Sequence, residues 1–354
     1  MKYRTLGWTG TVVSNVGLGT MGFGTETAQD DAFAVLDAFI DAGGNLLDTA
    51  DAYGDGASEE VLGRWFASRP ASTTDRALLA TKARFAVGPD ANANGLSRRH
   101  LRRALDASLH RLGRDNVDLY QLHSWDPLTP VEETAGFLGD AIAAGKITYY
   151  GLSNFTGWQT QLFVSTARAM GVPLPATMQA QYSLAAREIE FEVVPASLHN
   201  GIGILPWSPL ASGFLSGKYR KEETAAQDTR GGGSHGALFE HVIADLTSRD
   251  QNWSIVEVLR EVASELGAEP SQVALSWIAD RPGVVAPLIG AKHLRQLQQN
   301  LAAADLALDE SVTERLEQVS APRPNDYPYG PFGQKQRDRY VHSSDTVMGE
   351  LFDH

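Results

Sequence analysis

Residues 44–53 read Gly-Asn-Leu-Leu-Asp-Thr-Ala-Asp-Ala-Tyr. The short apolar run Asn45-Leu46-Leu47 is typical of a buried strand, and the polar residues Asp48 and Tyr53 follow its end. Before it, residues 30–42 form an amphipathic stretch that opens with acidic residues and is closed by two glycines, which predicts a helix. This stretch therefore predicts a helix followed directly by a buried strand, the unit of an α/β fold.

The same alternation recurs along the chain. Further helices are predicted over residues 97–112, capped by Ser97 and stopped by Gly113, and over residues 131–144. Eight buried strands are predicted at residues 16–19, 44–47, 77–80, 117–120, 147–152, 176–179, 202–206 and 284–288. Eight strand–helix units predict an α/β protein with a (β/α)8 TIM barrel over residues 1–320.

Three segments lie outside this alternation. Residues 2–14, with a turn at 7–10, predict an N-terminal β-hairpin that closes the bottom of the barrel. Residues 219–250 form an insertion after the seventh strand with a glycine-rich centre, and we expect either a lid over the catalytic face or a disordered loop. The C-terminal extension, residues 321–354, carries five aromatic residues, which favour packing on the barrel or on a partner chain.

The composition excludes several classes of function. The 354 residues carry a net charge of −13, which argues against nucleic-acid or anionic-membrane partners. The basic run at 98–103 falls on a predicted outer helix, where a solvated face explains it. Without cysteine there are no disulfides, thiolate nucleophiles or Cys-based zinc sites. With no signal core or spanning segment, we expect a cytoplasmic protein, monomeric or homo-oligomeric.

Polar side chains follow three successive predicted strands. Asp48 and Tyr53 follow the second strand, Lys82 the third and His123 the fourth. In a (β/α)8 barrel these strand ends share the catalytic face. Carbonyl reduction needs a proton for the developing alkoxide. A tyrosine can supply it if an ammonium lowers its pKa, while a carboxylate holds the ammonium and an imidazole orients the carbonyl. The four residues together predict a carbonyl-reducing site.

Each of these residues taken singly has a structural explanation, and a metal-dependent hydrolase is the main competing interpretation. Asp48, Asp51 and His123 could act as metal ligands. The first strand lacks an H-x-H pair, however, and no second histidine stands at a strand end. We therefore expect no metal site.

The second half of the chain supplies groups that suit a nicotinamide nucleotide. Ser153 and Asn154 suit a carboxamide, Trp207 can stack on a ring, and Lys218 can pair with a pyrophosphate. A helix opens within residues 289–300, after the eighth strand, where barrels usually bind phosphate.

From about Tyr3 to Ala321 the chain resembles the aldo-keto reductase family. Residues 44–53 are similar to that family's second-strand signature, and Lys82 and His123 fall where its lysine and histidine belong. The resemblance implies that Tyr53 is the general acid, or the base in the reverse direction. It also implies that Lys82 and Asp48 tune Tyr53, and that His123 orients the carbonyl.

The resemblance further implies a cofactor, NADP(H), and a set of residues that bind it. These are Thr20, Met21, Ser153, Asn154, Gln179, Trp207, Ser208, Leu210, Lys218, Gly290, Lys292, Gln296, Gln299 and Asn300. Trp207 stands where tyrosine is common, and Gln296 where many members carry arginine. That leaves Lys292 to hold the 2′-phosphate as a point charge, and we expect NADPH over NADH.

The sequence thus predicts NADPH-dependent reduction of small aldehydes or ketones to alcohols. Two other functions stay open. One is a nucleotide-binding regulatory or redox-sensing subunit, because residues 207–218 resemble the branch of the family that includes channel-associated subunits. The other is an alcohol or sugar dehydrogenase that works mainly in the oxidative direction. Substrate choice is expected to depend on the loops around residues 21–23, Trp125 and the 219–250 insertion, with the aromatic C-terminal tail as a further candidate.

Overall fold

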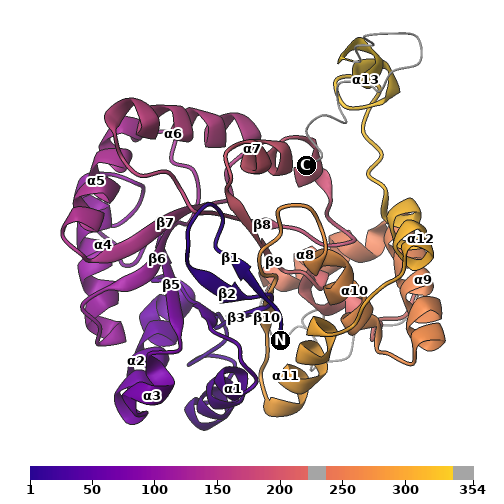
Figure 1. The fold of residues 1–354 in the computed structure, drawn as a ribbon, viewed down its shortest axis with the longest axis horizontal. Coiled ribbons are helices and arrows are strands. Elements are labelled where there is room, and N and C mark those ends of the chain that lie inside the picture. The colour runs from indigo at the N-terminus through magenta and orange to yellow at the C-terminus, as the bar shows by residue number, and fades with distance from the viewer. Residues whose placement is uncertain (222–236, 338–354) are drawn as a thin grey trace. The chain divides into compact units, whose positions relative to one another are not determined.

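The computed structural model describes residues 1–221 and 237–337. Its central feature is a ring of eight parallel strands with helices around it (Figure 1). The strands are β3 (Gly17–Gly19), β4 (Leu46–Asp48), β5 (Leu78–Ala83), β6 (Val117–Leu122), β7 (Ile147–Ser153), β8 (Thr177–Gln181), β9 (Gly203–Trp207) and β10 (Leu288–Gly290). They pair in chain order, and β10 pairs with β3. The fold is the predicted (β/α)8 TIM barrel.

Helices connect the strands and cover the outside of the ring. They are α1 (Gln29–Asp41), α2 (Ala57–Ser68), α3 (Ala71–Thr74), α4 (Arg98–Leu112), α5 (Val131–Ala143), α6 (Gly157–Met170), α7 (Val193–His199), α8 (Ala237–Ser248), α9 (Asp250–Leu266), α10 (Pro270–Ala279), α11 (Leu294–Leu301) and α12 (Glu310–Ser320). Helix α13 (Pro331–Arg337) belongs to the separate C-terminal unit. Short 3-10 helices are η1 (Tyr53–Gly56), η2 (Glu188–Phe191), η3 (Ala211–Ser216) and η4 (Ala302–Ala304). Among the described residues, no helix is both long and apolar enough to cross a membrane.

The ends of α4 follow the local signals in its sequence. The Ser97 side chain accepts the His100 backbone N–H at 3.3 Å, and Gly113 adopts a left-handed conformation with φ of +61° at the C-terminal end. Both predicted boundaries are confirmed. Helix α4 leads into β6, and His123 is the residue directly after that strand.

The eighth strand differs from its prediction at 284–288. It runs from Leu288 to Gly290, because Pro287 has no amide hydrogen to give to the ladder. The residues before this strand close the ring instead, because the Val285 N–H donates to the carbonyl oxygen of Ile204 on β9 at 2.9 Å. The barrel is therefore closed by an irregular segment and a short strand.

The predicted N-terminal hairpin is present as β1 (Tyr3–Thr5) and β2 (Val12–Ser14), paired antiparallel (Figure 1). Leu6 and Val13 are buried in one apolar cluster with residues from the barrel strands, among them Leu46. This hairpin therefore covers the end of the barrel opposite the predicted catalytic residues, as expected.

The insertion and the C-terminal extension are described in part. The glycine-rich centre of the 219–250 insertion, residues 231–236, lies outside the described residues, so a lid remains a prediction. Its later part forms α8, a helix the sequence analysis did not expect, with Ile243 and Leu246 buried one turn apart. The chain divides into two compact units, Met1–Ser320 and Ala321–His354. In the second unit, Tyr327 and Phe332 are exposed, while Tyr340 and Phe352 lie outside the described residues.

Candidate active site

A buried ion pair lies where β4 and β5 end. Lys82 Nζ donates to Asp48 Oδ2 at 2.7 Å, to the Thr49 carbonyl oxygen at 2.7 Å and to the Tyr53 hydroxyl at 3.1 Å. Lys82 is fully buried and Asp48 is 3% exposed. A buried charge is tolerated only when it is paired and hydrogen-bonded, and these three acceptors satisfy all three ammonium protons. The lysine therefore points its charge at the Tyr53 oxygen.

Two glutamine side chains hold the other oxygen of Asp48. Gln179 Nε2 donates to Asp48 Oδ1 at 2.8 Å and Gln121 Nε2 donates to it at 3.1 Å. Gln121 is not among the predicted site residues. Its signal was a polar residue inside an otherwise apolar strand, two positions before His123 and so on the same face of β6. Gln179, which is predicted to bind the nucleotide, also holds the carboxylate of Asp48.

His123 follows β6 and lies against the tyrosine. The rings of His123 and Tyr53 meet edge to face with their centroids 5.8 Å apart. The Phe85 ring also packs against the His123 ring, with a centroid distance of 4.7 Å. Within the described residues, His123 Nδ1 is buried without a hydrogen-bond partner. The structure thus brings all four predicted catalytic residues together, although their roles remain predictions.

Burial sets the protonation of this cluster. It raises the pKa of Tyr53 above its usual value, and the opposing effect of Lys82 is smaller. The expected lowering of this pKa is therefore wrong for the site as it stands, because removal from water disfavours the phenolate. Burial would lower the pKa of Lys82, but Asp48 and Tyr53 outweigh it and raise that pKa. Burial, Lys82 and Arg84 lower the pKa of His123 to about 2. The resting site holds a phenol, an ammonium and a neutral imidazole.

A second group of buried charged residues lies next to the ends of β4 and β5. Glu59 on α2 is fully buried, and its carboxylate accepts bonds from Thr81 Oγ1 at 2.5 Å and from Arg111 Nε at 2.7 Å. Asp51 lies close by, 1% exposed, and its backbone N–H donates to the Lys82 carbonyl oxygen at 3.0 Å. Burial and the neighbouring Glu59 raise the pKa of Asp51 to about 7.

The raised pKa of Asp51 predicts that the wild type loses stability as the pH rises, and that Asp51→Asn does not show this loss. The unfolded chain loses the Asp51 proton near pH 4, whereas the folded protein keeps it until about pH 7. Over that interval the unfolding free energy of the wild type should fall with rising pH, by up to about 1.4 kcal/mol per pH unit from this group. Urea unfolding at pH 4.5 and pH 8 should therefore show the variant gaining on the wild type by a few kcal/mol. A difference that is the same at both pH values would contradict it.

Strained backbone marks the same face of the barrel. Among the described residues, the non-glycine residues with left-handed φ all lie in loops after β4, β7 and β9: Asp55, Asn154, Ser208, Ala211 and Ser212. Such strain persists only where the surrounding structure enforces it, and it clusters at functional sites. The strained backbone therefore indicates, independently of residue type, that these loops belong to the functional site.

The loops after β7 and β9 are joined to the histidine. Trp207 Nε1 donates to Asn154 Oδ1 at 2.9 Å, and Asn154 Nδ2 donates to the His123 carbonyl oxygen at 2.9 Å and to Ser153 Oγ at 3.2 Å. Four residues from the ends of β6, β7 and β9 thus form one hydrogen-bonded chain. It places the Trp207 indole and the Asn154 amide, both predicted to bind a nicotinamide, beside the catalytic cluster.

The turn after β9 brings an ammonium group close to a glycine backbone. Gly213 has φ of +87°, and a Cβ placed on it would lie 3.1 Å from Lys218 Nζ. The Ser212 backbone N–H donates to Ser208 Oγ at 3.0 Å, which fixes the tight turn. A bare backbone with an ammonium beside it is the arrangement a pyrophosphate needs. The residues present therefore fit a dinucleotide here.

The loop after β10 contains the residues predicted to bind the adenosine phosphate. Lys292 Nζ forms an ion pair with Glu26 Oε2 at 3.0 Å, and Gln296 Oε1 accepts the Lys292 backbone N–H at 2.9 Å. Glu26 comes from the loop between β3 and α1, so this pair links the first and last barrel loops. A 2′-phosphate would compete with Glu26 for Lys292, a partner the sequence analysis did not identify.

The other predicted nucleotide residues occupy varied positions. The Thr20 hydroxyl is buried and donates to the Asp48 carbonyl oxygen at 3.0 Å, so it ties β3 to β4. Asn300 Nδ2 donates to the Gly290 carbonyl oxygen at 3.3 Å. Met21 and Leu210 are half-buried, and Gln299 is exposed on α11. Nucleotide contacts by these residues remain predictions.

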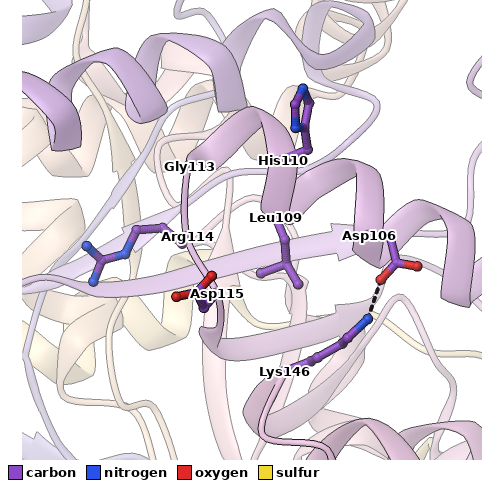
Figure 2. A pocket seen from close by; sticks show the side chains of 7 residues that line it. All are labelled: Asp106, Leu109, His110, Gly113, Arg114, Asp115 and Lys146. Atoms are coloured by element: carbon purple, nitrogen blue, oxygen red, sulfur yellow. Dashed lines mark hydrogen bonds and ion pairs between the residues drawn. The ribbon is translucent and has the colours of Figure 1, made fainter.

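A surface hollow of about 390 Å³ lies away from this cluster (Figure 2). It is found where α4 ends and where β6 and β7 begin, so it is at the opposite end of the strands from Lys82. The Lys146–Asp106 ion pair crosses it. The hollow plays no part in the site. Over residues 1–221 and 237–337, no cluster of three metal-binding side chains is found.

The sequence matches known proteins over most of its length. A model of the Aldo/keto reductase family matches residues 15–321. The chain belongs to the aldo/keto reductase family. This makes it a member of an oxidoreductase family that acts on carbonyl compounds and generally uses NADH or NADPH.

Individual relatives of this aldo/keto reductase have different names. An uncharacterized oxidoreductase, YrpG, of Bacillus subtilis is 34% identical over 331 residues, covering 90% of this chain and 96% of that protein. A probable voltage-gated potassium channel subunit beta of Oryza sativa is 34% identical over 328 residues, covering 92% and 98%. L-glyceraldehyde 3-phosphate reductase of Escherichia coli is 33% identical over 310 residues, covering 86% and 87%.

Proposed function

We propose that residues 1–320 reduce aldehydes or ketones to alcohols with NADPH, and that Tyr53 donates the proton. The observation that carries the proposal is the hydrogen-bonded series from Asp48 through Lys82 to the Tyr53 hydroxyl, with the His123 ring beside it. A cytoplasmic location remains part of this proposal.

The protein's own groups divide the work of proton transfer. The Tyr53 oxygen accepts a hydrogen bond from Lys82, so its own O–H is left to donate to a carbonyl oxygen. As the proton leaves, the ammonium stabilises the phenolate, and Asp48 keeps the ammonium in place. The neutral His123 imidazole has one N–H with which to orient the carbonyl. In the reverse direction Tyr53 takes the proton back.

The nucleotide would lie against the loops after β7, β9 and β10. Bound there, it supplies the hydride for the carbonyl carbon. Asn154 and Ser153 would hold the carboxamide, Trp207 would stack on the nicotinamide, and Lys218 would pair with the pyrophosphate. Lys292 would meet the 2′-phosphate that distinguishes NADPH from NADH.

The Glu26–Lys292 ion pair gives this preference a test. Glu26→Gln removes the carboxylate that competes with the 2′-phosphate, so the Kd for NADPH should fall roughly two- to fivefold, the range of one exposed ion pair. The Kd for NADH should change little, because NADH lacks that phosphate. Quenching of tryptophan fluorescence measures both, with the exposed Glu314→Gln as the charge-matched control. Equal changes in Kd for NADPH and NADH would contradict the proposal that Lys292 binds the 2′-phosphate.

Activity on a carbonyl panel tests the proposal itself. Wild-type protein with NADPH should consume the nucleotide when given aromatic aldehydes, aliphatic aldehydes or sugars in turn. Tight NADPH binding with no turnover of any carbonyl would instead favour a regulatory or sensing subunit. The similarity to a probable potassium channel subunit beta is the observation that keeps this second candidate open.

A further inference from the structure

Arg84 stands beside the catalytic histidine, one residue beyond the end of β5. Its guanidinium carbon lies 5.3 Å from the centroid of the Phe85 ring, and that ring lies 4.7 Å from the ring of His123. Its charge is also close enough to help lower the pKa of His123. Arg84 therefore adds a positive charge near the position where a carbonyl substrate would bind.

The Arg84 side chain makes no hydrogen bond and no ion pair in the described part of the chain. Its Nε is buried and makes no hydrogen bond there, and no described carboxylate lies within ion-pair distance of Arg84. By contrast, Arg69, Arg111 and Arg187 each bind a carboxylate at 2.8 Å or less. In a protein of net charge −13, a cation beside an active site without an ion-pair partner calls for an explanation.

Asp126 is the acidic neighbour that could have neutralised Arg84, but its oxygens are already engaged. They accept the Leu96 backbone N–H at 2.8 Å, the Thr129 hydroxyl at 2.6 Å and the Leu128 backbone N–H at 3.0 Å. A buried N–H with no acceptor is costly, and an incoming anion would remove that cost.

Aromatic side chains follow the ends of β5, β6 and β7, and Phe85 is in contact with Arg84. Phe85 is 38% exposed, and Trp125, two residues after His123, meets Trp158 edge to face at 5.6 Å. Trp158 is 59% exposed. These rings offer apolar contact to the carbon skeleton of a ligand whose charged end meets Arg84.

We propose that Arg84 binds an anionic group on the carbonyl substrate, so that the preferred substrates are anionic aldehydes or ketones with an apolar body. The planar guanidinium matches the two oxygens of a carboxylate or phosphate. This inference rests on the proposed reductase function.

A matched pair of substrates tests it. The ratio of kcat/KM for 4-carboxybenzaldehyde to that for its methyl ester should be about tenfold or more in the wild type, typical of one charge-assisted hydrogen bond. Arg84→Met should bring the ratio near one, and Arg84→Lys should retain part of it. The exposed Arg99→Met on α4 makes the same change in net charge and should leave the ratio unchanged. 4-Formylphenyl phosphate in a third arm distinguishes phosphate from carboxylate.

A ratio near one in the wild type, or an unchanged ratio in Arg84→Met, overturns the inference. If the wild type turns over neither substrate, the proposed function fails instead. The anion site is then judged by calorimetry with 4-carboxybenzyl alcohol: binding to the wild type that weakens about tenfold in Arg84→Met supports it, and equal or absent binding overturns it.

Discussion

Replacing Tyr53 with phenylalanine should lower kcat/KM for carbonyl reduction by about 10²–10⁴-fold, the usual contribution of a general acid. The change removes the hydroxyl to which Lys82 donates a hydrogen bond, and it leaves the aromatic ring against His123 in place. Steady-state kinetics should show the loss with every carbonyl that the wild type accepts.

The affinity for NADPH separates loss of chemistry from loss of structure. In Tyr53→Phe the Kd for NADPH should stay close to that of the wild type, because the proposed nucleotide contacts lie in other loops. Tyr327→Phe, at an exposed tyrosine outside the barrel unit, should match the wild type in both measurements. A Tyr53→Phe enzyme as active as the wild type would refute the assignment of the proton donor.

Replacing Lys82 with methionine should affect both activity and stability. The fully buried ammonium holds Asp48 and faces Tyr53, so its loss leaves a carboxylate buried without its countercharge. Breaking a buried pair in this way costs about 3–5 kcal/mol. Urea unfolding should show this loss, and kcat/KM should fall by about 10²–10⁴-fold because the phenolate is no longer stabilised.

The double variant Asp48→Asn, Lys82→Met separates the two effects. An amide at position 48 no longer needs a countercharge, so much of the stability should return while activity does not. If the double variant is as unstable as Lys82→Met, the loss comes from packing and not from an unpaired charge. Recovery of activity would contradict the role of the ammonium.

Much of the fold was available from the sequence because its signals are local. Short apolar runs, the Ser97 cap and Gly113 placed strands and helices, and the barrel topology then put Asp48, Lys82 and His123 on one face. The eighth strand was misplaced because an apolar run at 284–288 does not reveal that Pro287 interrupts the ladder. Helix α8 was missed because it follows directly on a glycine-rich segment.

The parts of the site that escaped prediction depend on contacts between distant residues. Gln121 reaches Asp48 across 73 positions, and Glu26 meets Lys292 where the first and last barrel loops adjoin, because β3 pairs with β10. The direction of the Tyr53 pKa shift also depends on burial, which outweighs the lysine and is not visible in residue order. Residue types and spacing predict which groups meet, whereas their protonation needs the packed structure.

Deuterium transfer tests the central claim most directly. Wild-type protein with NADPH carrying deuterium at the transferable C4 position should convert an accepted aldehyde to an alcohol with one deuterium on the former carbonyl carbon, detected by mass spectrometry. Tyr53→Phe, although it binds the same nucleotide, should form that alcohol at least about 10²-fold more slowly. Unlabelled alcohol, or no alcohol from a wild-type protein that binds NADPH tightly, would contradict the account.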